Sequence, residues 1–133
     1  MVSKGVMRQL EQLRKGDLVC VSWCDASVGK ASGSGSAIDV PVKSWGVYVG
    51  VFGEKAKHIV LAQNSFRYAD GLYDLDYTAI PLGWTFSVEI VGKSHLPEEV
   101  ASALVNSFLL GGRRMFNRAR AAQQRVNLHG GLG

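Results

Sequence analysis

The residue types best suited to binding chemistry lie near the C-terminus of this 133-residue chain. Residues 113–133 contain five arginines and no side-chain carboxylate. These arginines are Arg113, Arg114, Arg118, Arg120 and Arg125. A guanidinium group binds phosphate through paired hydrogen bonds, and a cluster without acidic partners attracts nucleic acid in a salt-sensitive way. The pattern predicts phosphate contacts, with RNA favoured over DNA, and leaves open an acidic protein partner or a solubilising tail.

A second set of candidate contact residues is aromatic and lies in a polar segment in the middle of the chain. Phe66, Tyr68 and Tyr73 surround Arg67 and an Asp70-Gly71 turn signal. Exposed rings can stack on bases, and arginine adds a phosphate contact. We therefore expect Phe66, Arg67, Tyr68 and Tyr73 to form an exposed nucleic-acid-binding surface.

Two further aromatic residues, Trp45 and Trp84, lie in predicted strands. Large rings within alternating apolar strands usually fill a core. We interpret both tryptophans as core residues, with base stacking as the alternative.

Patterns that would indicate catalysis or metal binding are incomplete. Cys24, Asp25 and Ser27 offer a thiol, a carboxylate and a hydroxyl at a strand end, but the sequence supplies no further catalytic partner. The segment 29–32 lacks the upstream glycine and the following helix of a phosphate-binding loop. Four ligands at zinc-finger spacing are absent from the sequence. We expect no enzymatic activity, no metal and no cofactor.

The net charge of +4 is unevenly distributed along the chain. Residues 1–16 carry +3, residues 17–92 carry −3 and residues 93–133 carry +4. No apolar run reaches the roughly 20 residues that span a bilayer, so we expect a cytoplasmic protein with no membrane partner. Cys20 and Cys24 would lie roughly 13 Å apart along a strand, so both thiols are expected to be reduced.

Hydrophobic periodicity predicts a mainly β fold with a helix at each end. Residues 1–16 form an amphipathic helix around Val6, Leu10 and Leu13, and residues 17–92 form the β domain with a mobile Gly/Ser loop at 26–39. Residues 93–110 form a C-terminal helix, and residues 111–133 form an arginine-rich tail, helical or disordered. The expected strands are 17–23, 44–52, 58–63, 77–80 and 84–91, with strands two and three antiparallel.

This element order resembles that of small SH3-like barrels, and the leading helix is similar to that of the Sm-like branch. The resemblance covers residues 6–91 and includes the tight Pro81-Leu82-Gly83 link before the last strand. It implies a closed five-stranded barrel that serves nucleic-acid or protein recognition. The uridine-binding residues of Sm-like rings are not carried over, because the segment 58–64 matches them only faintly.

A shorter resemblance involves the segment Trp45-Gly46-Val47-Tyr48-Val49-Gly50. It looks like a strand of papain-like NlpC/P60 and lecithin:retinol acyltransferase proteins, in which a histidine precedes a similar run. Here Ser44 occupies that position, and no cysteine opens a helix. The resemblance therefore does not predict the activity of those enzymes.

The sequence leads to two hypotheses. The first is a non-enzymatic nucleic-acid or ribonucleoprotein-binding module whose arginine-rich tail contacts phosphates. The second is a structural or assembly subunit, viral or cellular, whose helix at 97–110 and tail dock on a neighbouring chain, giving a homo-oligomer or a larger assembly.

Overall fold

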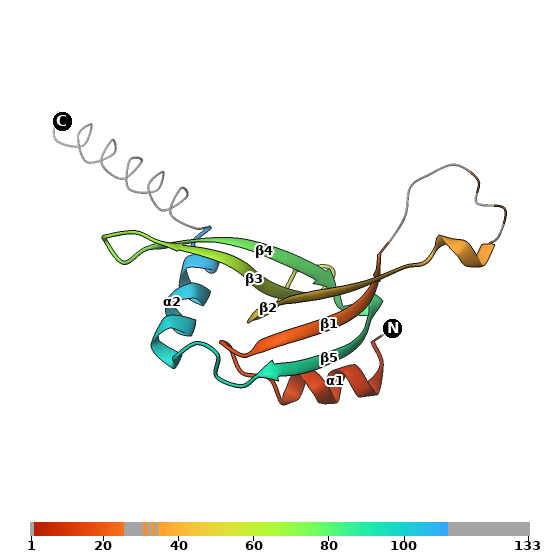
Figure 1. The fold of residues 1–133 in the computed structure, drawn as a ribbon, viewed down its shortest axis with the longest axis horizontal. Coiled ribbons are helices and arrows are strands. Elements are labelled where there is room, and N and C mark those ends of the chain that lie inside the picture. Colours follow the sequence, from red (N-terminus) through yellow and green to blue (C-terminus); the bar gives the residue numbers. More distant parts are fainter. Residues whose placement is uncertain (1, 26–30, 32, 34, 112–133) are drawn as a thin grey trace, which may run out of the picture.

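The computed structural model describes residues 2–25, 31, 33 and 35–111 (Figure 1). The described part of the chain is mainly β, with five antiparallel strands and an α-helix on either side of them in sequence. The elements are α1 (Lys4–Glu11), β1 (Leu18–Asp25), η1 (Gly35–Ile38), β2 (Val40–Phe52), β3 (His58–Arg67), β4 (Tyr73–Pro81), η2 (Leu82–Trp84), β5 (Thr85–Gly92) and α2 (Glu98–Leu109). Within this part, no helix is long and apolar enough to cross a membrane.

The five strands form one open sheet in the order β4-β3-β2-β1-β5. The predicted antiparallel pairing of strands two and three is confirmed, as β2 with β3. The predicted closed barrel is wrong, because β4 and β5 lie at opposite edges of the sheet and do not pair with each other. The physical reason is visible at β5, where α1 packs against the strand in place of a fifth strand pairing (Figure 1).

Two hydrophobic clusters lie on opposite faces of this sheet. Ile59 and Leu61 of β3 belong to the larger cluster, in which α1 contributes Val6. Val60 and Ala62 belong to the smaller one, which includes Val105 of α2. Because successive side chains of a strand point to opposite faces, α1 and α2 cover different sides of the sheet.

Helix α1 begins and ends with specific hydrogen bonds. The Ser3 hydroxyl accepts a hydrogen bond from the Val6 amide, which is the usual N-cap arrangement. The helix ends at Glu11, earlier than the predicted Lys15. The Arg14 amide, which a longer helix would use internally, donates instead to Oδ2 of Asp17 at 2.9 Å.

Asp17 is buried and joins three parts of the chain. Its Oδ1 accepts a hydrogen bond from the Ser94 amide at 2.8 Å, while Oδ2 accepts the one from Arg14. Its backbone carbonyl accepts from the Tyr48 amide, and the preceding Gly16 amide donates to the Tyr48 carbonyl. The turn after α1 is thereby fixed to β2 and to the connection between β5 and α2. We call this set of contacts the Asp17 junction.

The hairpin of β3 and β4 is longer than predicted. The segment 64–76, predicted as a loop with at most a short hairpin, contains four further strand pairs from Asn64↔Asp76 to Arg67↔Tyr73. The predicted Asp70-Gly71 turn is present: Asp70 Oδ1 accepts from the Leu72 amide, and Gly71 has a φ of +84°. Backbone hydrogen bonds between paired strands do not require apolar side chains. The hydrophobic pattern therefore predicted strands that are shorter than β3 and β4.

A bulge in β2 changes which side chains face each cluster. The register against β3 shifts between Tyr48 and Gly50. As a result, Val51 packs against the larger cluster and Phe52 against the smaller one, the reverse of simple alternation. The backbone of β3 approaches closely at Gly46, where a Cβ would lie 2.9 Å from the Ala62 carbonyl oxygen.

One hydrogen bond from α1 satisfies a single backbone amide on the free edge of β5. The side-chain oxygen of Gln9 accepts a hydrogen bond from the Val88 amide at 2.8 Å. An unpaired edge amide would otherwise be exposed to other strands or be left unsatisfied beside the core. Gln9 therefore helps to protect the β5 edge from further pairing and to keep the sheet open.

We expect Asp17→Asn to lower the free energy of unfolding by about 1–3 kcal/mol, because the new NH2 group faces an amide that needs an acceptor. Urea denaturation followed by circular dichroism measures the change. The exposed Asp39→Asn is the matched control and should leave stability unchanged. Equal stability of the two variants would show that the Asp17 junction is not energetically important.

We expect Gln9→Leu to destabilise the protein by about 1–2 kcal/mol, because the Val88 amide loses its acceptor. Gln12→Leu is the matched control, since Gln12 lies on the exposed side just after α1. Thermal unfolding of both variants tests this prediction. A larger loss in Gln12→Leu than in Gln9→Leu would contradict it.

Candidate nucleic-acid interface

The arginines that the sequence singled out, Arg113, Arg114, Arg118, Arg120 and Arg125, lie outside the described residues. Their predicted phosphate contacts stay a prediction. The chain leads into them directly from the end of α2, which stops at Leu109. The interface must therefore be sought first among the described residues.

The structure separates the four predicted residues of the β3–β4 hairpin. Phe66 is 58% exposed and pairs with Asp74, whereas Tyr73 pairs with Arg67. Neighbouring residues of one strand point to opposite faces, so the Phe66 and Tyr73 rings do not share a surface. The expectation that Tyr73 is exposed is wrong, because this ring is buried.

The surroundings of the exposed ring at Phe66 are acidic. Tyr68, which is partly exposed, donates its hydroxyl hydrogen bond to Asp74 at 2.8 Å. The Asn64 amide donates to the carboxylate of Asp76, two pairs further along the same ladder. Two carboxylates beside Phe66 disfavour the approach of a phosphate backbone.

Both tryptophans that we interpreted as core residues are exposed. Trp45 is 57% exposed and Trp84 is 45% exposed. Trp45 pairs with Cys20, on the face opposite Val19 and Val21 of the larger cluster. Trp84 ends the short η2 helix before β5. The core interpretation failed because strand alternation fixes the side of a residue but does not reveal whether a helix covers that side.

A basic surface surrounds α1. Five exposed cations gather on this helix, on the turn that follows it and on the connection after β5. They are Lys4, Arg8, Arg14, Lys15 and Lys93. Glu11 is the one exposed acidic residue within α1 and that turn, in which Asp17 is buried. In the described part of the chain, none of the five side chains forms an ion pair.

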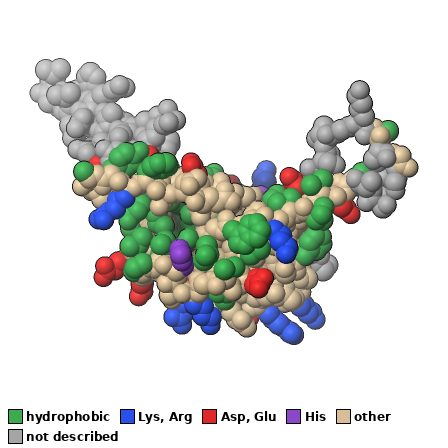
Figure 2. Space-filling model, in the orientation of Figure 1, with side chains coloured by type: hydrophobic (Ala, Val, Ile, Leu, Met, Phe, Trp, Pro, Cys, Tyr) green, Lys and Arg blue, Asp and Glu red, His purple; other side chains and the backbone are tan. Residues whose placement is uncertain are grey.

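Figure 2 shows Lys and Arg side chains along the lower margin of the molecule, where α1 runs in Figure 1. Lys4, Arg8 and Glu11 follow one helical stripe, opposite the Val6 and Leu10 stripe that packs on the sheet. The charge of +3 on residues 1–16 was the sequence signal for this surface. The predicted phosphate contacts were placed in the larger arginine cluster at the C-terminus, so no cation of residues 1–16 was predicted as a contact residue.

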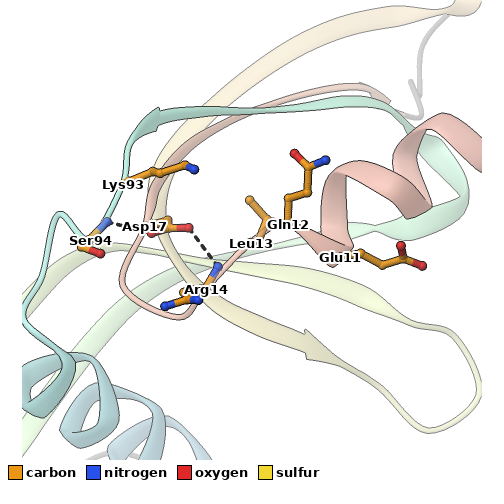
Figure 3. A pocket seen from close by; sticks show the side chains of 7 residues that line it. All are labelled: Glu11, Gln12, Leu13, Arg14, Asp17, Lys93 and Ser94. Atoms are coloured by element: carbon orange, nitrogen blue, oxygen red, sulfur yellow. Dashed lines mark hydrogen bonds between the residues drawn. The ribbon is translucent and has the colours of Figure 1, made fainter.

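A pocket of about 570 Å³ opens at one end of the basic surface. Its lining comes from the end of α1, the Asp17 junction and the connection after β5. The residues are Glu11, Gln12, Leu13, Arg14, Asp17, Lys93 and Ser94 (Figure 3). In Figure 3, the Lys93 and Gln12 side chains point toward the same open space, and the Arg14 guanidinium points away from them.

The amides of Arg14 and Ser94 are not available to a ligand in this pocket, because the Asp17 carboxylate already accepts from both. The hydrogen-bond donors that remain free for a ligand are therefore the side chains at the rim of the pocket. A phosphate oxygen can approach the Lys93 ammonium there without entering the pocket floor, where the carboxylate would repel it.

The residues weighed for other chemistry lie apart from this surface. Cys20 and Cys24 are free thiols, as predicted. Within the described residues, no three His, Cys, Asp or Glu side chains are grouped so that they could hold a metal ion. Ser44, at the position of the histidine in the acyltransferase-like segment, accepts a hydrogen bond from the Trp23 indole at 3.0 Å. Burial raises the pKa of the Tyr48 phenol, which packs against the larger cluster.

Comparison of the chain with protein-family models, with curated proteins and with solved structures gave no match. The described residues define a small mainly β protein with an open antiparallel sheet and one basic helical side.

Proposed function

We propose that this chain is a non-enzymatic nucleic-acid-binding module in which the basic surface of α1 contacts phosphates. The observation that carries the proposal is the set of five exposed cations, which form no ion pair in the described part, while Glu11 is the one exposed acidic residue of α1 and the turn after it. Lysine and arginine side chains without ion-pair partners displace the counterions that are condensed around a nucleic-acid backbone. The release of these counterions supplies affinity that tolerates any sequence. RNA is the favoured ligand, alone or within a ribonucleoprotein.

The C-terminal arginines extend this proposal. Five further guanidinium groups follow α2 in sequence, with no acidic residue among them. Together with the basic surface they would give two separate sets of phosphate contacts, one at each end of the chain. Affinity would then depend on both sets, and each would contribute to the salt dependence.

A second candidate function is that of an assembly subunit, and one observation favours it. Leu109 and Leu110, at the end of α2, are 62% and 56% exposed. Two adjacent exposed leucines, followed by the tail, offer an apolar contact for a neighbouring chain. In this case the tail would serve docking instead of phosphate binding.

We expect Lys4→Gln combined with Arg8→Gln to weaken binding of a labelled 20-nucleotide oligouridylate. Because each single-strand phosphate contact contributes about 0.7 to the salt slope, the slope should fall by about 1.4. Fluorescence anisotropy between 50 and 200 mM salt measures both quantities. Ser102→Glu combined with Asn106→Glu changes the net charge equally on the exposed side of α2 and is the matched control. An equal effect of the control would mean that net charge, and not the basic surface, determines binding.

We expect replacement of Arg113, Arg114, Arg118 and Arg120 by glutamine to weaken RNA binding uniformly across sequences and to flatten its salt dependence further. Light scattering of the same variant separates the two candidate functions. Loss of affinity at unchanged mass supports nucleic-acid binding. Loss of an oligomer at unchanged RNA affinity supports the assembly subunit.

A further inference from the structure

One half of the sheet face on which α2 packs carries an exposed tryptophan. Helix α2 packs against β4 and β2, where Phe52, Phe108 and Tyr77 form aromatic contacts. The register places three side-chain rows on the rest of this face. They are Leu18 with Val47, then Glu89 with Cys20 and Trp45, then Ser87 with Ser22 and Lys43. We call these residues the open face.

The backbone of Trp45 lies in a paired strand, although its ring is exposed. Its backbone pairs with Cys20 of β1 on one side. On the other side the ladder with β3 has ended at Val47, and the Gln63 side chain donates to the Trp45 carbonyl instead. A backbone that already lies in a strand does not have to be ordered when a ligand stacks on the ring.

The charges near Trp45 favour a phosphate backbone. Lys43 lies two residues along the same strand and face, about 7 Å away along β2, and is exposed. Glu89 lies two strands away, at about 10 Å. The nearer charge is therefore the cation. This distinguishes Trp45 from Phe66, whose cross-strand neighbour is Asp74.

A second exposed ring lies on the same face. Tyr77 is 55% exposed, follows Val47 and Ala62 in one cross-strand row, and contacts Phe108 edge-on with ring centroids 5.1 Å apart. By strand spacing and rise, Trp45 and Tyr77 lie roughly 12 Å apart. That separation lets the two rings contact different bases of one strand.

We infer that the open face binds single-stranded nucleic acid, with one base stacked on Trp45 and the adjacent phosphate near Lys43. This inference rests on the proposed function and names the form of its ligand. Stacking on a flat sheet requires an unpaired base, since the ring faces of a duplex are covered by neighbouring base pairs. The basic surface lies beyond β5, so a strand crossing this edge would meet both sites.

The test compares Trp45→Leu, which keeps an apolar side chain, with Trp45→Phe, which keeps a ring. Trp84→Leu is the matched control, because Trp84 is also exposed but lies in η2. Each full-length variant is titrated with the single-stranded oligouridylate and with a 20-base-pair RNA duplex. We expect Trp45→Leu to weaken single-strand binding about tenfold at an unchanged salt slope, and the control to match the wild type.

A fluorescence measurement keeps the inference testable if Trp45→Leu does not fold. Single-stranded RNA should quench the wild-type tryptophan emission, and this quenching should be lost in Trp45→Phe and kept in Trp84→Phe. Quenching retained in Trp45→Phe would overturn the inference.

The remaining outcomes separate this inference from the proposed function. Salt-dependent binding of the wild type with unchanged affinity in Trp45→Leu overturns the open face alone. An equal loss for single strand and duplex also overturns it. Conversion of an oligomer to a monomer in Trp45→Leu at unchanged RNA affinity would mean that a second copy covers the open face. No binding of either RNA by the wild type at low salt would remove the proposed function, and the inference with it.

Discussion

The structure depends on one buried carboxylate, that of Asp17. Its two oxygens accept hydrogen bonds from the amides of Arg14 and Ser94, which are 80 residues apart in the sequence. The same residue connects to Tyr48 of β2 through its backbone. A buried carboxylate is costly unless hydrogen bonds satisfy it, so these partners hold the end of α1, the centre of the sheet and the start of the α2 connection together.

This junction explains why the sheet is open and unevenly covered. It stops α1 at Glu11 and turns the chain directly into β1, so that the short helix lies along β5. It also directs the chain after β5 toward the other face, where α2 reaches β4 and β2. Two short helices cannot cover both faces of a five-stranded sheet, and Trp45 is left exposed.

The helices and strands were largely predictable from the sequence, but the parts of the sheet that the helices cover were not. Alternating apolar residues located the strands, and apolar residues at helical spacing located both helices, because these patterns reflect local geometry. Barrel closure, the full length of the β3–β4 hairpin and the exposure of Trp45 depend on contacts between distant segments. In the candidate site, residues 1–16 showed their positive charge in the sequence, whereas the side of the sheet on which Trp45 lies required the pairing with Cys20.

In the proposed function, the two surfaces would supply different kinds of contact. The basic surface around α1 offers long, flexible cationic side chains, which suit phosphates at variable positions and give affinity without sequence preference. The open face would offer a ring on a paired strand, on which one base can stack. Edge strand β5 separates the two, and the Gln9 side chain occupies its Val88 amide, which disfavours the addition of another polypeptide strand at this point.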